Sequence, residues 1–265
     1  MKDKDHQSGA QVMLNKVPEI TLFFWIIKIL CTTVGETGAD FLNTKLNFGL
    51  DGVTLIIGAM LGVTLIFQFK SKKYVPGIYW LAVVLISIVG TLITDNLTDN
   101  LGIPLMYTTI FFTISLSIVF AVWYKKEKTL SIHTIITSKR EAFYWLAILF
   151  TFALGTAAGD LLAETINLGY LLSAIIFGGL IAAVAISHFV FRVNAILAFW
   201  IAYILTRPLG ASIGDYLSQD LSNGGLGLGT VITSVIFLAT ILATVIYLTI
   251  TKKDVIRKSN FGDQI

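Results

Sequence analysis

Residues 25–40 read WIIKILCTTVGETGAD, and three later segments repeat this pattern: WLAVVLISIVGTLITD at 80–95, WLAILFTFALGTAAGD at 145–160 and WIAYILTRPLGASIGD at 200–215. In each segment a tryptophan stands ten residues before a glycine, which stands five residues before an aspartate. Three residue types that recur four times in register indicate an internal repeat. The repeated residues are Trp25, Trp80, Trp145 and Trp200, then Gly35, Gly90, Gly155 and Gly210, then Asp40, Asp95, Asp160 and Asp215.

The composition is that of a membrane protein. Hydrophobic residues make up 55% of the 265 residues, charged residues only 13%, and the mean hydropathy is +0.82. Ordinary soluble domains carry about 25% charged residues. The sparse basic residues argue against nucleic-acid binding, and the single cysteine, Cys31, excludes a disulfide scaffold within the chain.

Eight stretches are long enough to cross a bilayer, which takes about 20 apolar residues per helix. They lie at residues 19–41, 50–69, 77–97, 103–124, 141–163, 168–190, 194–216 and 227–250. Apolar and polar residues do not alternate strictly along them, which argues against a β-barrel. The predicted fold class is therefore an all-α polytopic membrane protein with eight transmembrane helices.

Each repeat contains two spans, so all four copies should cross the membrane in the same orientation. Parallel repeats of this kind are related by pseudo-symmetry about the membrane normal. The predicted organisation is a tail at 1–18, repeats at 19–75, 76–125, 141–192 and 193–250, a loop at 126–140 and a tail at 251–265.

The distribution of basic residues predicts that both termini are cytoplasmic. Of the 19 Lys and Arg residues, 16 fall in the tails and in the loops on that side, whereas the opposite loops hold only Lys45. Cytoplasmic loops carry such an excess. The tryptophans then lie near the cytoplasmic membrane surface, where they are expected to act as interface anchors, and the small glycines are expected at helix contacts.

The repeated aspartates are the candidate functional residues. Acids inside membrane spans generally face the bundle interior and serve function. A second acid or amide stands one helical turn from each aspartate, namely Glu36, Asp99, Glu164 and Gln219. A helix C-terminus carries partial negative charge, so acids placed there cost free energy unless a positive group lies among them. The alternative is four helices that simply end in a solvated carboxylate.

Oxygen ligands without histidine or cysteine favour a hard cation such as Mg²⁺, Mn²⁺ or Ca²⁺. We therefore expect the aspartates, with Glu36, Asp99 and Glu164, to bind a divalent cation or to exchange protons. The metal would be a substrate, and no resident cofactor is expected. Cys31 is expected to be a small packing residue.

Two basic residues lie within spans. Arg207 stands eight residues before Asp215, about two turns inward on a similar face, and is a candidate counter-ion for the acids. The alternative for Arg207 is a structural salt bridge. Lys28 lies near the start of its span and is expected to extend toward the cytoplasm.

The four-fold pattern, with KVPEITLFFWIIKI and TTVGETGADFL in the first copy, resembles a family of bacterial integral membrane proteins built from a repeat of unknown function. Members are described as uncharacterised membrane-anchored proteins. The resemblance covers residues 16–250 and implies the eight-span fold and the bacterial inner membrane. A weaker similarity links Glu36-Thr37-Gly38-Ala39-Asp40 to manganese and calcium exporters that carry a Glu-x-Gly-Asp motif.

Three functions are compatible with the sequence. The first is a secondary transporter or exporter of a hard divalent cation, coupled to protons, with the lipid bilayer and a small inorganic cation as its partners. The second is a structural or stress-associated membrane protein in which the acids and Arg207 stabilise the bundle. The third is a membrane-embedded enzyme, but motifs of intramembrane aspartyl proteases and phosphotransferases are not met, so we expect no enzyme. The oligomeric state is left open.

Overall fold

The computed structural model describes residues 15–45 and 49–255, and these residues form eight long helices apolar enough to span a membrane. The helices are α2 (Leu22–Lys45), α3 (Gly49–Lys70), α4 (Pro76–Asp95), α5 (Leu105–Glu127), α6 (Ser138–Asp160), α7 (Tyr170–Phe189), α8 (Ala195–Ser218) and α9 (Thr230–Thr251). The part of the chain that the structure describes contains no β-strand. The predicted all-α, eight-span fold class is confirmed.

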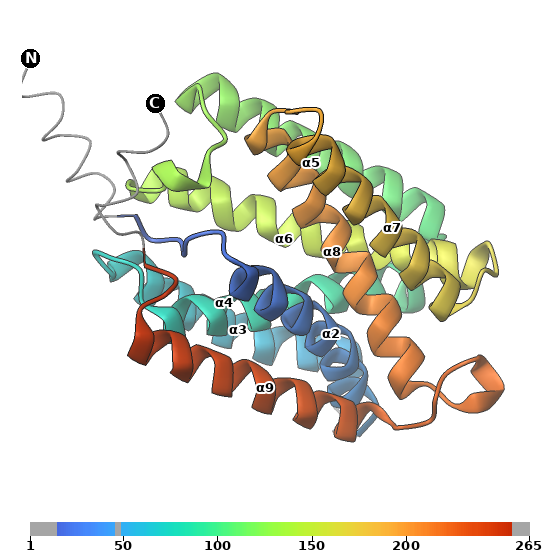
Figure 1. Cartoon of the computed structure of the whole chain (residues 1–265). Coiled ribbons are helices and arrows are strands. Elements are labelled where there is room, and N and C mark those ends of the chain that lie inside the picture. The colour runs from blue at the N-terminus through green and yellow to red at the C-terminus, as the bar shows by residue number, and fades with distance from the viewer. Residues whose placement is uncertain (1–14, 46–48, 256–265) are drawn as a thin grey trace, which may run out of the picture.

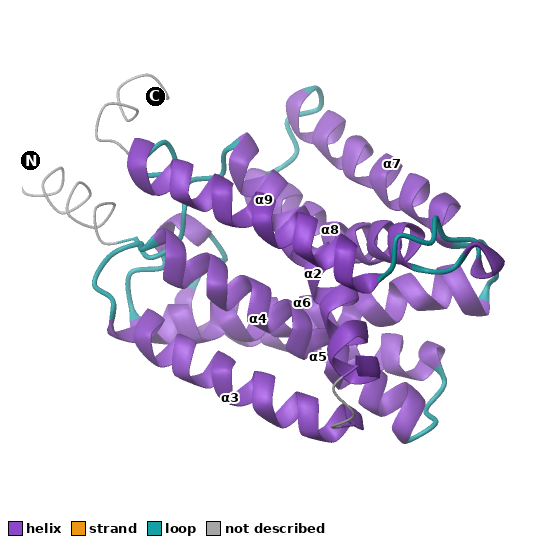
Figure 2. Cartoon of the chain, turned by 90° about the horizontal axis from the view of Figure 1, so that it is seen from below, coloured by secondary structure: helices purple, strands orange, loops and turns teal. Residues whose placement is uncertain are grey.

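The helices form an inner ring and an outer shell (Figures 1 and 2). The first helix of each repeat, α2, α4, α6 and α8, packs against two others in a closed ring. Between 61% and 78% of the most apolar stretch of these helices is buried, against 11–28% for α3, α5, α7 and α9. Large apolar side chains such as Leu55, Ile110 and Val235 are exposed on the outer shell, as expected of a surface that faces lipid.

The repeats are interlocked. Each outer helix packs chiefly against the inner helix of the next repeat: α3 on α4, α5 on α6, α7 on α8, and α9 on α2 (Figure 1). Contacts between the two helices of one repeat are fewer. Since α9 is the last helix and α2 the first, this pairing closes the ring, and no repeat buries its apolar faces without its neighbour.

The repeated glycines lie at the joints between inner helices. A methyl group added at Gly35 would stand 2.7 Å from Cβ of Ser87, and one at Gly90 would stand 2.6 Å from Cβ of Phe152. The same relation holds for Gly155 with Arg207 and for Gly210 with Thr32, at 2.5 Å each. In every case the partner stands three residues before the glycine of the next repeat. The predicted role of the four glycines in helix packing agrees with these contacts.

The first and last described residues lie at one end of the ring, which we call the terminal end. The opposite end, where the repeated aspartates lie, is the acidic end. Residues 15–18 are buried rather than part of a free tail, which corrects the predicted tail boundary. Nζ of Lys16 donates to Glu141 at 2.7 Å and to the Phe69 carbonyl at 2.9 Å. The Glu19 amide donates to the Asp254 carbonyl at 3.0 Å. Residues 1–14 and 256–265 of the two predicted tails lie outside the described residues.

Burial raises the pKa of the Tyr74 hydroxyl, and the neighbouring Asp254 carboxylate raises it further. Tyr74 therefore remains protonated and donates to Oδ2 of Asp254 at 2.6 Å. The Tyr74 amide also donates to the carbonyl of Asn15 at 3.2 Å. These bonds join the first described residues, the loop between α3 and α4, and the segment after α9.

The tryptophans lie toward the terminal end, but three of them face protein. Trp80, Trp145 and Trp200 are 2–4% exposed, and Trp200 donates its indole N–H to the Leu130 carbonyl at 2.9 Å. The prediction that they anchor the chain in the lipid headgroup region is therefore wrong for these three. They pack with phenylalanines and tyrosines between the inner helices, and Trp25 is half-buried against Phe199.

Candidate functional site

The inner faces of α2, α4, α6 and α8 are lined by residues four apart, and equivalent residues of the four repeats form layers along the ring axis. Starting from the terminal end, the layers are Phe24, Tyr79, Tyr144 and Phe199; Lys28, Val83, Ile148 and Tyr203; Thr32, Ser87, Phe152 and Arg207; Glu36, Thr91, Thr156 and Ala211; and the four aspartates. All members of the first four layers are buried. The aspartate layer lies at the acidic end and is partly exposed, except for the buried Asp215.

Arg207 occupies the centre of the ring and is completely buried. Its guanidinium donates to Oε2 of Glu36 at 2.7 Å, to Oγ1 of Thr156 at 2.6 Å and to Oγ1 of Thr91. It also donates to the Thr32 carbonyl at 3.2 Å. One side chain of the fourth repeat is thereby bonded to all three others. The predicted counter-ion role is consistent with this position, although the ion pair that forms is with Glu36.

Lys28 does not extend to the membrane surface as expected, because it is fully buried in the second layer. Its ammonium group lies 4.2 Å from the ring centre of Tyr203 and 4.3 Å from that of Phe152, and it donates to Oγ1 of Thr206 at 3.2 Å. Two aromatic faces and one hydroxyl therefore hold this charge in place of water.

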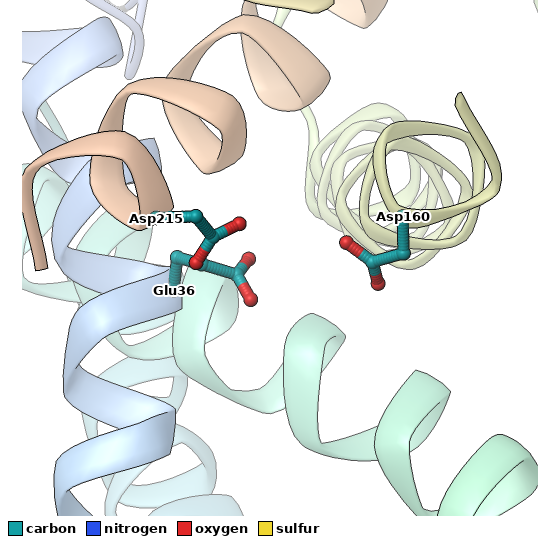
Figure 3. Close-up of side chains that lie close together, drawn as sticks. All are labelled: Glu36, Asp160 and Asp215. Carbon is teal, nitrogen blue, oxygen red and sulfur yellow. The ribbon is translucent and has the colours of Figure 1, made fainter. Parts of the chain in front are cut away.

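Three carboxylates converge at the acidic end. One oxygen of each of Glu36, Asp160 and Asp215 lies within 4.8 Å of the others (Figure 3). They come from α2, α6 and α8, and their side chains point toward one another across the space between these helices. Two oxygens bound at about 2.4 Å on opposite sides of one Ca²⁺ would be about 4.8 Å apart, so the cluster has the spacing of a cation site.

The other predicted acids surround this cluster. Asp40 and Asp95 lie within electrostatic range of each other and of Glu36. Asp99 and Glu164 are exposed; Asp99 accepts from Thr98 at 3.0 Å, and Glu164 accepts from the Tyr170 hydroxyl at 3.3 Å. The structure thus brings the predicted acids together at one end, with Asp99 and Glu164 on the rim.

Asp99 and Glu164 lie in equivalent structures that the sequence pattern did not predict. The segments Asn96–Asn100 and Leu161–Thr165 are π-helical turns that directly follow Asp95 and Asp160. Such turns are rare and occur frequently at functional sites. The first repeat lacks this arrangement, since α2 continues as an α-helix to Lys45.

Sequence spacing alone did not separate Glu36 from these rim acids. Glu36 directly follows the repeated glycine, whereas Asp99 and Glu164 stand nine residues after theirs. The residues equivalent to Glu36 are Thr91, Thr156 and Ala211, so Glu36 is the only acid in its layer. Aligning the four copies position by position would have placed it next to Arg207. The buried Lys16–Glu141 pair was also missed, because Lys16 was assigned to the tail.

The axis between the cluster and the terminal end is filled by protein. Arg207, Lys28 and the aromatic side chains of the first two layers occupy it, and Arg207, Lys28, Tyr79, Tyr144 and Tyr203 are fully buried. In this conformation the acids are therefore reached from the acidic end alone, where the aspartate layer is partly exposed.

A protein family described as a Repeat of Unknown Function (DUF347) matches the chain four times, over residues 23–74, 78–129, 143–194 and 198–254. The chain belongs to this family. Each match contains one inner helix with its Trp, Gly and Asp anchors and the outer helix that follows it. Searches of curated proteins and of solved structures found no match. The DUF347 match agrees with the resemblance inferred from the repeated motifs.

Proposed function

We propose that this DUF347 protein is a secondary transporter or exporter of a hard divalent cation such as Mn²⁺, Mg²⁺ or Ca²⁺, coupled to protons. The carboxylate cluster of Glu36, Asp160 and Asp215 carries the proposal. Its oxygens supply the ligand type that hard cations prefer. Carboxylates that bind a cation in one state and protons in another couple the two movements by competition for one site.

The position of Arg207 supports a site that alternates between occupants. The guanidinium pairs with Glu36 at an N–O distance of 2.7 Å. A divalent cation in the cluster would replace that positive charge, and Arg207 would then retain its threonine partners Thr91 and Thr156. When no cation is bound, the ion pair would thus keep the buried acid from being left without a counter-charge.

The membrane and orientation are part of the same proposal. We place the chain in the bacterial inner membrane with the terminal end in the cytoplasm, because 16 of its 19 basic residues belong to that side. The acidic end then faces outward and attracts cations. We do not propose enzymatic activity.

A second candidate is favoured by the number of bonds that Arg207 makes. Its contacts with Thr32, Thr91, Thr156 and Glu36 connect all four repeats, which is what a purely structural network would require. In that case the acids would serve to hold the bundle together, and metal binding would be weak or absent.

Metal binding by the purified protein separates these candidates. Asp160→Asn and Asp215→Asn should each abolish saturable Mn²⁺ binding, measured by electron paramagnetic resonance, while the variants keep the thermal midpoint of the parent. The control is Asp220→Asn, since Asp220 is an exposed acid at the same end of the ring. Normal Mn²⁺ binding by both variants would contradict the transporter proposal, and unfolding of both would favour the structural role.

A further inference from the structure

Titratable and hydroxyl side chains continue along the ring axis from the acid cluster to the terminal end. On α6, Glu141 stands near the terminal end, one turn before the axial residue Tyr144, and Asp160 stands at the acidic end. Nineteen residues at 1.5 Å each span about 28 Å, close to the thickness of the hydrocarbon core. Within this distance the inner faces of the four inner helices contribute Lys28 from α2, Tyr203 from α8, and the pair Tyr79 and Tyr144 from α4 and α6, each fully buried.

The tyrosines lie between the two charged ends of this series. The hydroxyl groups of Tyr79 and Tyr144 are 2.5 Å apart and hydrogen-bonded to each other. The Tyr203 hydroxyl is buried and has no hydrogen-bond partner among residues 15–45 and 49–255. The ring of Tyr203 contacts the Lys28 ammonium group, and its hydroxyl lies within electrostatic range of Tyr144. Buried polar atoms without protein partners are normally satisfied by bound water.

Glu141 ends the series at the terminal end. It is 1% exposed and accepts hydrogen bonds from Nζ of Lys16 at 2.7 Å and from the amide of Gln68 at 3.0 Å. It stands one helical turn before Tyr144 on α6 and is within electrostatic range of that hydroxyl. Intramembrane ionisable residues arranged in such chains mark proton relays in transporters.

We propose that the axis between Lys28 and Glu141 is a proton path that serves the cation exchange proposed above. A hydrated metal ion does not pass these layers, because the side chains that fill them are fully buried, whereas a proton moves along hydroxyls and single waters. The proposed path therefore rests on the proposed transport function, and it specifies the route that the coupling protons would take.

The relay balances proton by proton. The Lys28 ammonium gives a proton through water to the Tyr203 hydroxyl oxygen, and that hydroxyl releases its own proton toward the Tyr79–Tyr144 pair. The pair passes one proton to the Glu141 carboxylate in the same way, and each tyrosine returns to its neutral form. Lys28 regains a proton from the acid cluster through water, and Glu141 releases its proton to water at the terminal end, so each cycle moves one proton along the axis. The charged group nearest to Lys28 is Arg207, and Cys31 stands one turn away on α2. An arginine keeps its proton in proteins, whereas a buried lysine can release one, so the relay begins at Lys28.

Two transport measurements on purified protein in lipid vesicles test the path. The first is Mn²⁺/Mn²⁺ counterflow, which needs the metal site but no proton movement. The second is proton movement driven by a Mn²⁺ gradient, followed with a pH-sensitive dye inside the vesicles. Lys28→Met and Glu141→Gln should lower the second by about 100-fold, the usual contribution of a positioned proton-transfer group, and leave the first unchanged. Matched controls are Glu127→Gln, at the surface of the terminal end, and Tyr247→Phe on α9.

The outcomes separate the path from the transport function. Unchanged proton movement in Lys28→Met and Glu141→Gln overturns the path, as does a wild type that shows counterflow but moves no protons under a Mn²⁺ gradient. A wild type without counterflow overturns the proposed function. In that case, proton movement driven by a membrane potential tests the path by itself. The path is supported if Lys28→Met abolishes this proton movement and is overturned if it does not. If Lys28→Met does not fold, Lys28→Arg keeps the charge without releasing a proton and should show the same loss.

Discussion

The close packing of the inner helices predicts that a methyl group added at one of the repeated glycines lowers the free energy of unfolding. Gly90→Ala is the most decisive change, because the new methyl group would lie 2.6 Å from Cβ of Phe152 and 3.1 Å from the Ala153 amide nitrogen. Neither atom is the flexible tip of a side chain, so α4 and α6 must move apart. Overpacking of this kind costs about 1–3 kcal/mol. In an uncrowded helix the same substitution stabilises by about 0.5–1 kcal/mol.

The control is Gly62→Ala on α3, where a methyl group would have no neighbour within 4 Å. We expect the two variants to differ by about 1–3 kcal/mol, because the gain in helix propensity is common to both and the overpacking cost falls on Gly90→Ala alone. The measurement is thermal unfolding of both proteins in one detergent, followed by circular dichroism. For a chain of this size each kcal/mol corresponds to about 2–4 °C, so Gly90→Ala should unfold about 2–12 °C below Gly62→Ala. Equal midpoints would refute the close packing of inner helices at the repeated glycines.

Three further predictions concern the ion pairs and the interlocked repeats. Arg207→Met should destabilise the protein by about 3–5 kcal/mol in chemical denaturation, and adding Glu36→Gln should restore part of that loss, because the single change leaves a buried acid unpaired; an additive double variant would contradict the coupling. Lys16→Met should speed proteolysis near residue 70, whereas Lys139→Met should change little, since its ion pair is exposed. A chain that ends at residue 228, without α9, should lose protection of α2 in hydrogen exchange, and retained protection there would argue against ring closure.

The sequence repeat is enough to predict the ring of inner helices, but it does not predict that each outer helix packs on the inner helix of the next repeat. The anchors fix equivalent positions on four helices, and a parallel repeat with an even number of spans must place these positions at the same depth. Which outer helix covers which inner helix depends on contacts between residues far apart in the chain. Phe23 on α2 and Tyr247 on α9 have ring centres 5.6 Å apart, yet nothing in the spacing of the first and fourth copies connects them.

The tryptophans and Lys28 show that the depth of a residue in the membrane does not determine whether its side chain faces lipid or protein. The sequence predicts that they lie near the start of each inner helix, but a residue at that depth can face lipid or a neighbouring helix. Trp80 and Trp145 face the neighbouring helix and are 2–4% exposed. Lys28 is four residues from Thr32 on the same stripe, so it points toward the axis and not toward the membrane surface. What decides the environment of these residues is the angle of each side chain around the helix axis.

The charged residues of the axis are departures from the repeat. Lys28, Arg207 and Glu36 each stand in a layer whose other three members are uncharged. A copy of Arg207 in every repeat would place four guanidinium groups around one axis, and two like charges 4 Å apart repel by about 4 kcal/mol even at an effective dielectric constant of 20. One basic residue per layer avoids that repulsion and still reaches all four helices. The aspartates recur in every copy, and three of the four are partly exposed at the acidic end, where water can offset their charge. The glycines therefore build the symmetric ring, and the single departures from symmetry supply the charge on which both proposed functions of the site depend.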